Sequence, residues 1–269
     1  MGRIYTIANQ KGGVGKTTTT VNLGAYLARF GQRVLLVDLD PQANASSCLG
    51  IDKRTVKNGT YDVIIGENPA IKYILYNPQL KLSLLPSSLA LAGAEVELVA
   101  VIARETRLKK ALQPIADRYD YILIDCPPSL GLLTLNGVVA ARDGVIIPVQ
   151  CEYLALEGVG QLNQTLARIR AAIFPNLRVR GVVLTMFDIR TKLSADVVRE
   201  ITHHFPEQVF QAIIPRSIRL AEAPSYGQPI TVYAPGSNGA IAYSNLAREI
   251  LAGDGVLIAE SIPTLVSAA

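Results

Sequence analysis

A glycine-rich segment with two lysines lies near the amino terminus, and its residue types suit phosphate binding. The run Lys11-Gly12-Gly13-Val14-Gly15-Lys16-Thr17-Thr18 follows a short apolar stretch and opens a helical pattern. Glycines let successive backbone N–H groups point at phosphate oxygens, and a helix that begins there directs its positive end at the same place. Lys16 can reach the β- and γ-phosphates, and the Thr17 hydroxyl can coordinate Mg²⁺. The seven residues from Gly12 to Thr18 are therefore predicted to bind a nucleotide.

Carboxylates at the ends of two apolar runs can complete such a site. Asp38 and Asp40 follow one run, and Asp125 follows another. In open α/β sheets, ligands bind where parallel strands end at their carboxyl edge. Asp125 is expected to hold Mg²⁺ through water, in the manner of the acidic residue that accompanies a P-loop.

Apolar runs alternate with helical patterns along most of the chain, which predicts an α/β fold. Strands are expected at residues 3–8, 33–37, 82–85, 121–124, 144–149, 181–187 and 211–214, and helices at 16–30 and 154–173. Most of the strands are continuously apolar, as in strands covered on both faces. The pattern predicts a doubly wound, mostly parallel sheet with helices on both faces, of the P-loop NTPase type. Residues 50–80 are expected to form loops and short helices.

Composition is that of a globular, cytoplasmic protein. The 269 residues are 49% hydrophobic and 18% charged, a balance typical of folded domains. We expect one domain over residues 1–252 and cannot assign the tail, 253–269. No apolar run reaches membrane-spanning length and no secretory signal is visible, so no membrane partner is expected. Three scattered cysteines fit a reducing compartment.

Positive charge is concentrated in one part of the chain. The net charge is +4, but residues 163–220 contain nine basic and four acidic residues. The rest of the chain is therefore close to neutral. This asymmetry points to an anionic partner.

The P-loop departs from the standard pattern in a specific way. Gln10 stands where a glycine is usual, and Lys11 adds a second lysine. The sequence thus resembles the deviant Walker A motif of the ParA/MinD/nitrogenase-iron-protein superfamily. The resemblance implies that Lys11 reaches across a dimer to the partner's nucleotide. It also implies that Asp40 orients the attacking water, that Asp38 supports the Mg²⁺ shell, and that hydrolysis is slow without a partner.

Further segments narrow the resemblance to the ParA (Soj-type) partitioning ATPases. They are residues 9–18, 38–44, 125–130, 154–158 and 220–225. The resemblance runs to about Glu249, nearly the whole chain. It implies that ATP drives a sandwich dimer, that the dimer binds DNA without sequence preference, and that a ParB-like centromere-binding protein triggers hydrolysis. Association with the nucleoid would follow.

Family resemblance also suggests positions for the contacts to DNA, base and partner subunit. Arg190, Lys192, Arg216 and Arg219 are the expected DNA-binding residues, although each could be an ordinary solvated charge. Pro215 is expected at the adenine pocket by analogy. Glu152 is expected at the dimer interface together with Lys11, with a simple surface acid as the alternative.

Three other functions compete with partitioning. A MinD-type membrane ATPase needs a basic amphipathic C-terminal helix, whereas the last sixteen residues contain no Lys or Arg. A nitrogenase-type iron protein needs two cysteines placed for a shared cluster, and the spacing of Cys126 and Cys151 does not match. A P-loop kinase or ligase acting on a small molecule would not need the basic stretch.

Overall fold

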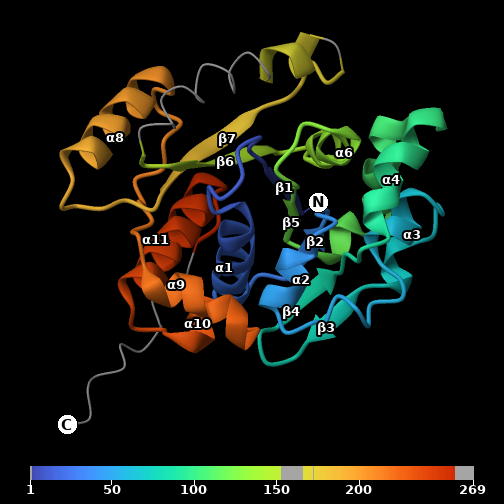
Figure 1. Ribbon diagram of the computed structural model, residues 1–269, viewed down its shortest axis with the longest axis horizontal. Coiled ribbons are helices and arrows are strands. Elements are labelled where there is room, and N and C mark those ends of the chain that lie inside the picture. The colour runs from blue at the N-terminus through green and yellow to red at the C-terminus, as the bar shows by residue number, and fades with distance from the viewer. Residues whose placement is uncertain (1, 153–165, 172, 258–269) are drawn as a thin grey trace.

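A seven-stranded sheet forms the centre of the structure, a computed structural model that describes residues 2–152, 166–171 and 173–257 (Figure 1). The strand order is β3-β4-β2-β5-β1-β6-β7, and every pairing is parallel except that of β3 with β4. The strands are β1 (Arg3–Ile7), β2 (Val34–Asp38), β3 (Leu75–Asn77), β4 (Leu82–Leu85), β5 (Tyr121–Asp125), β6 (Gly144–Gln150) and β7 (Val179–Thr185). The predicted mostly parallel sheet is thus confirmed.

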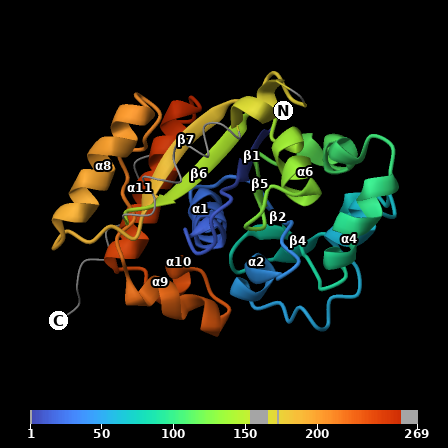
Figure 2. The same ribbon diagram turned by 45° about the horizontal axis from the view of Figure 1, so that its top comes forward.

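Helices cover both faces of this sheet, as the continuous apolar strands predicted. One face carries α1 (Lys16–Arg29), α2 (Asn44–Cys48), α9 (Ile218–Glu222), α10 (Ile230–Tyr233) and α11 (Asn238–Gly253). The other carries α3 (Thr60–Ile64), α4 (Leu91–Glu97), α5 (Arg107–Leu112), α6 (Leu132–Ala140) and α8 (Lys192–His204). Short 3₁₀ turns are η1 (Ala70–Lys72), η2 (Leu98–Ala100), η3 (Arg104–Thr106), η4 (Gln113–Arg118) and η5 (Ala223–Tyr226). Figure 2 shows α1 beneath the central strands, with α8 and α4 at opposite ends of the molecule.

Alternation along the strands divides the core into two layers. Tyr5, Leu36 and Leu123 pack with α1 and α11, whereas Leu35 and Ile122 pack with α5 and α6. Successive side chains of a strand point to opposite faces, so strands that are buried on both sides must be apolar throughout. All five residues of β5 are buried for this reason.

The expected strand at residues 211–214 is wrong. Isolated bridges flank this segment on both sides, Val182 with Val209 and Phe187 with Pro215, and the N–H of Ile214 donates to the carbonyl of Leu184 in β7 at 2.8 Å, but no strand forms. The backbone N–H groups of residues 211 and 212 donate instead to the carboxylate of Glu249 on α11, at 2.8 and 3.1 Å. The carboxylate of Glu249 thus accepts the backbone N–H groups that a strand would have donated to the neighbouring strand.

Smaller differences occur elsewhere. The β7 strand covers Val179–Thr185 rather than 181–187, since Met186 leaves the extended conformation with φ of 54°. The short edge strand β3 was not predicted, because its residues are largely exposed and form no buried run. Of the expected helix at 154–173, residues 166–171 are helical, and most of the remainder lies outside the described residues.

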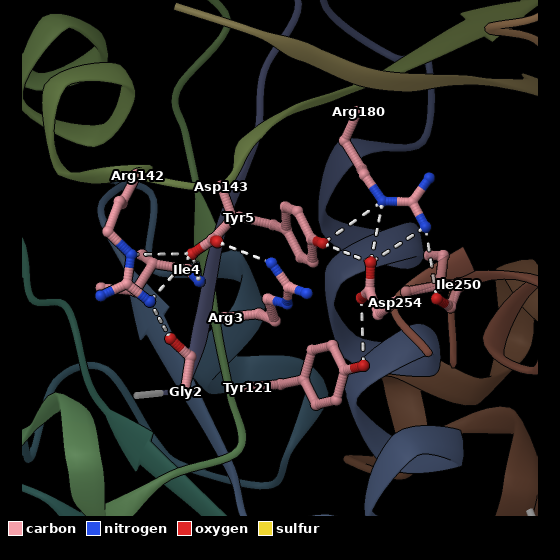
Figure 3. Close-up of polar contacts among 10 residues, drawn as sticks. All are labelled: Gly2, Arg3, Ile4, Tyr5, Tyr121, Arg142, Asp143, Arg180, Ile250 and Asp254. Carbon is pink, nitrogen blue, oxygen red and sulfur yellow. Dashed lines mark hydrogen bonds and ion pairs between the residues drawn. The ribbon is translucent and has the colours of Figure 1, made fainter. Parts of the chain in front are cut away.

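The end of α11 is fastened to the sheet by a buried carboxylate. Asp254 accepts hydrogen bonds from the hydroxyls of Tyr5 and Tyr121, at 2.8 and 3.0 Å, and forms an ion pair with Arg180 (Figure 3). Burial and the nearby carboxylate raise the pKa of both tyrosines well above their usual value. This cluster lies toward the amino ends of β1, β5 and β7, opposite the edge that carries the P-loop.

Nowhere in the described part of the chain is a helix both long enough and apolar enough to cross a membrane.

Candidate functional site

The glycine-rich segment forms a tight loop between β1 and α1. Gly13 and Gly15 have φ of 74° and 88°, the left-handed region that glycine adopts without strain. Helix α1 begins directly after Gly15, so its positive end faces the loop. Asn9 braces the loop from one side by donating to the carbonyl of Pro148 in β6, at 2.8 Å. Thr185 braces it from the other by donating to the carbonyl of Val14, at 2.9 Å.

The two lysines of the loop have different environments. Lys16 is buried, and its ammonium donates to the main-chain oxygen of Lys11 at 2.9 Å. Burial lowers the pKa of Lys16, against the attraction of Asp125. The side chain of Lys11 makes no hydrogen bond or ion pair with any residue that the structure describes. One lysine is therefore held within its own loop, and the side chain of the other has no partner in the part of the chain that the structure describes.

Asp125 lies beneath the loop and accepts two hydroxyl bonds from α1. Thr17 donates to one carboxylate oxygen at 2.7 Å, and Thr20 donates to the other at 3.0 Å. The strand end predicted to complete the site therefore meets the helix that begins at the P-loop. Full burial, and next to it the negative charge of nearby Asp38, raise the pKa of Asp125 to about 8.

Asp38 and Asp40 lie at the end of β2, the strand next to β5. Both the N–H and the hydroxyl of Ser46 donate to one oxygen of Asp38, at 2.8 and 2.7 Å. Burial nevertheless raises the pKa of Asp38 to about 6. Asp40 is also buried, and its carboxylate accepts the N–H of Gln42 at 2.8 Å.

This donor set fits the Mg²⁺ expected from the sequence. Asp38 and Asp125 are fully buried carboxylates, and the charge of Asp38 disfavours the ionisation of Asp125. A divalent cation would offset both charges. Mg²⁺ commonly uses one or two carboxylates together with phosphate oxygens and water. The hydroxyl of Thr17, already directed at Asp125, is the third oxygen that the sequence assigned to the metal.

A cavity of about 420 Å³ opens beside the P-loop and contains the residue expected at the adenine. Gly15, Thr18, Pro215 and Ile218 are among the residues that line it. Tyr243 of α11 also lines the cavity, and its hydroxyl is 3.2 Å from that of Thr19. A largely apolar cavity with few polar groups, next to a phosphate site, is suited to a planar base.

The four cations expected to bind DNA lie on two segments that the fold brings together. The N–H of Arg216 donates to the carbonyl of Phe187 at 2.9 Å, so the segment with Arg190 and Lys192 lies beside the one with Arg216 and Arg219. Each arginine is ion-paired on the surface: Arg190 with Asp188, Arg216 with Glu152 and Arg219 with Glu222. Lys192 is exposed and begins α8. The predicted interface residue Glu152 thus contacts a predicted DNA residue within one subunit.

Several supporting residues were missed in the sequence. Ser46 and Thr20 hold the acidic groups, and Thr185 holds the loop. The run of four threonines after Lys16 was the available signal for Thr20. Ser46 and Thr185 carried none, because their partners are brought near only by the fold.

The three cysteines do not suit an iron–sulfur cluster. Cys48, Cys126 and Cys151 are all buried, and burial raises the pKa of these thiols to about 12, 12 and 11. Cluster ligands are thiolates that two subunits would have to share at an exposed surface. The burial of these thiols argues against the iron-protein alternative.

Comparison with known proteins agrees with this geometry. A family model described as an AAA domain matches residues 2–179. The sporulation initiation inhibitor protein Soj of Bacillus subtilis (strain 168) is 52% identical over 94% of this chain and 99% of its own. The chromosome-partitioning ATPase Soj of Treponema pallidum (strain Nichols) is 49% identical over 95% of this chain and 99% of its own length. A solved structure of cobyrinic acid a,c-diamide synthase from Mycobacterium smegmatis contains a bound ATP analogue and magnesium. Its sequence is 38% identical and its TM-score is 0.83, over 95% of this chain and 96% of that one. This chain therefore belongs to the ParA/Soj family of chromosome-partitioning ATPases.

Proposed function

We propose that ATP joins two copies of this chain into a dimer that binds DNA without sequence preference, and that hydrolysis releases it. The observation that carries this proposal is the contrast between the two lysines of the P-loop. Lys16 is fixed in its own loop by the carbonyl of Lys11, whereas the Lys11 ammonium has no bond to the described residues. A cation beside a phosphate site that no described residue of its own subunit engages can neutralise the γ-phosphate of a facing subunit.

ATP and Mg²⁺ are the ligands that the site fits. The related synthase structure contains an ATP analogue and magnesium. In this chain the P-loop amides and Lys16 would hold the phosphates, and the cavity that contains Pro215 would receive the base. Thr17, Asp38 and Asp125 would surround the metal, whose charge screens the phosphate oxygens during hydrolysis.

Asp40 would position the attacking water rather than act as a strong base. Its carboxylate is buried and oriented by the N–H of Gln42. Positioning alone can lower a barrier substantially when the reactants are held in line. Hydrolysis by the isolated dimer would be slow, because no strong base takes the proton of the attacking water.

DNA binding would follow from bringing two copies of one basic surface together. Arg190, Lys192, Arg216 and Arg219 lie on adjacent segments, and the three arginines are paired with carboxylates, of which Asp188 is half-buried and Glu152 and Glu222 are exposed. Ion pairs at a solvated surface add little to stability, so phosphate groups can replace the carboxylates. Non-specific affinity rises steeply with the number of phosphate contacts, and a dimer doubles that number. A ParB-like partner would stimulate hydrolysis, and the ATP-bound dimer would associate with the nucleoid.

DNA retardation with ATP, with ADP and without nucleotide tests this switch. We expect retardation with ATP alone, equal for unrelated sequences, and release as ATP is consumed. The Asp40→Ala variant should bind with ATP but not release, since its hydrolysis should be about a hundredfold slower or more. Retardation that is equal in all three conditions would contradict the switch. Normal turnover in Asp40→Ala would contradict the role of Asp40.

A biosynthetic function is the second candidate, favoured by the likeness to cobyrinic acid a,c-diamide synthase at 38% identity. Identity to the Soj protein of Bacillus subtilis is higher, at 52%. An amide-forming synthase would also not need the adjacent basic segments. ATP consumption that depends on a small carboxylic acid, with no ATP-dependent DNA retardation, would favour this candidate.

A further inference from the structure

Ser87 lies just after β4 and reaches back to the acidic end of β2. It is fully buried, and its hydroxyl donates to the main-chain oxygen of Asp40 at 2.8 Å. The two strands are parallel neighbours, with Val37 opposite Leu85, so their carboxyl ends meet at the same edge of the sheet. Buried hydroxyls normally find a hydrogen-bond partner. The partner of Ser87 is the backbone of the residue that is expected to hold the attacking water.

Four hydrogen bonds close a ring that contains Ser87 and both aspartates of the β2 end. The N–H of Ser87 donates to the hydroxyl of Ser46 at 3.1 Å, and that hydroxyl donates to the Asp38 carboxylate at 2.7 Å. The N–H of Asp40 donates to the other oxygen of Asp38 at 3.2 Å. The bond from the Ser87 hydroxyl to Asp40 completes the ring. Three separate segments, the end of β2, helix α2 and the segment after β4, are joined in this way.

A second buried hydroxyl fixes the ring to the sheet. The hydroxyl of Thr60 lies 2.7 Å from the main-chain oxygen of Asp38 and 3.1 Å from that of Pro86. The N–H of Thr60 donates to Pro86 as well, at 2.9 Å. The residue before Ser87 is therefore held to the end of β2 independently of the ring. All members of the ring are buried, so water has little access to these bonds.

Resting on the proposed function, we propose that Ser87 is a positioning residue for ATP hydrolysis, which acts through the backbone of Asp40. Its hydroxyl holds the carbonyl of Asp40, and the carboxylate of Asp38 holds the N–H. The Cα that carries the Asp40 carboxylate is therefore restrained on both sides. A group misplaced by about 1 Å can lower a rate about a hundredfold. Such a restraint affects the rate although Ser87 itself need not contact the nucleotide.

Loss of the Ser87 hydroxyl should loosen Asp40 and leave the rest of the site in place. The carbonyl of Asp40 keeps a second donor, the N–H of Ala43, at 2.8 Å. The Asp38 carboxylate keeps both of its bonds from Ser46, at 2.8 and 2.7 Å. Nucleotide and metal binding should therefore persist when the restraint on Asp40 is removed.

The test compares Ser87→Ala with Ser88→Ala. Ser88 is the matched control, because it is also a buried serine, 8% exposed, and its hydroxyl has no hydrogen bond with any residue that the structure describes. Turnover of MgATP is followed as release of labelled phosphate, and ATP affinity by equilibrium titration. We expect Ser87→Ala to lower kcat at least about tenfold and to change the Kd of ATP less than about twofold. Ser88→Ala should match the wild type in both quantities.

Two further measurements separate positioning from folding. Once free ATP is removed, the ATP-bound dimer of Ser87→Ala should outlast that of the wild type by the factor lost in kcat, because hydrolysis is its release step. Thermal unfolding shows whether the variant is folded at the assay temperature. If it is not, Ser87→Cys, which fills the same space with a weaker donor, should show the same loss of kcat at unchanged ATP affinity.

The outcomes distinguish failure of this inference from failure of the proposed function. A wild-type kcat in folded Ser87→Ala, beside slow hydrolysis by Asp40→Ala, would remove Ser87 alone. Equal losses in the two serine variants would assign the effect to packing of the segment after β4. Weaker ATP affinity with an unchanged kcat would make Ser87 a structural residue. Normal turnover in Asp40→Ala would overturn the role of Asp40 itself, and the positioning role of Ser87 with it.

Discussion

The ammonium of Lys16 donates to the main-chain oxygen of Lys11 at 2.9 Å. The backbone of Lys11, and not its side chain, therefore holds the side chain of Lys16 in place. Substituting the Lys11 side chain should therefore leave this bond intact. We expect Lys11→Ala to bind ATP with near wild-type affinity and to form no dimer. Lys16→Ala should lose ATP binding itself, because its ammonium reaches the phosphates. Fluorescent-nucleotide titration and light scattering with ATP separate the two effects. An undiminished Lys11→Ala dimer would remove the trans role of this lysine.

Thr17 and Thr20 share one acceptor but should differ in function. Both hydroxyls donate to Asp125, and Thr20 is fully buried whereas Thr17 borders the phosphate loop. Thr20→Val keeps the shape and removes a bond to a buried carboxylate, which should cost about 1–3 kcal/mol of unfolding free energy. Thr17→Val should cost less stability and abolish the Mg²⁺ dependence of ATP binding. Urea unfolding and nucleotide titration with and without Mg²⁺ measure the two. Equal losses of metal dependence would contradict the assignment of Thr17.

Much of the fold was predictable because its signals are local. A buried parallel strand such as β5 must be apolar throughout, and the glycines of the P-loop are required by the backbone itself. Gln211 shows the limit. Its neighbourhood is apolar enough for a strand, but the carboxylate of Glu249, 38 residues away, takes its N–H. A local sequence pattern cannot show that a distant carboxylate competes with a strand for this N–H.

The site divides in the same way. Strand ends identify Asp38 and Asp125, since residue type and position along a strand are visible in the sequence. Ser46, which gives Asp38 two hydrogen bonds, and Thr185, which fastens the P-loop, depend on the packing of distant elements. The pairing of Arg216 with Glu152 is another such case, because a long stretch of chain separates the two residues.

The buried Asp254 should contribute to stability without affecting nucleotide binding. Asp254→Ala would leave the hydroxyls of Tyr5 and Tyr121 and the guanidinium of Arg180 without their shared acceptor (Figure 3). Removing one partner of a largely buried ion pair costs about 3–5 kcal/mol. We expect a loss near 3 kcal/mol in urea unfolding, because Arg180 keeps some contact with water. ATP affinity should not change, since the cluster lies at the opposite edge of the sheet from the P-loop. Asp254→Asn, which retains an acceptor, should lose less. A variant as stable as the wild type would show that α11 is held by its apolar contacts alone.

Arg190 and Arg54 provide a matched pair for testing the DNA surface. Each is exposed, at 82% and 79% of its side chain, and each bonds the aspartate two residues earlier, Asp188 and Asp52, through its main-chain N–H and its guanidinium. The pattern of hydrogen bonds is therefore the same, although Asp188 is less exposed than Asp52, at 19% against 43%. Arg190→Glu should weaken ATP-dependent binding at least about tenfold for all DNA sequences alike, and lower the salt dependence by roughly one phosphate contact per subunit.

Arg54→Glu should leave both quantities unchanged, although it makes the same change in net charge. Turnover of ATP without DNA should be that of the wild type in both variants, because neither arginine contacts the nucleotide site. Binding measured by fluorescence anisotropy over a series of salt concentrations gives the affinity and the slope together. If the two variants lose affinity equally, overall charge governs the interaction with DNA. A loss confined to Arg190→Glu would instead assign the contact to the surface beside Pro215, next to the cavity that would hold the base. Nucleotide and DNA would then meet on the same pair of chain segments, which is the arrangement that an ATP-dependent switch requires.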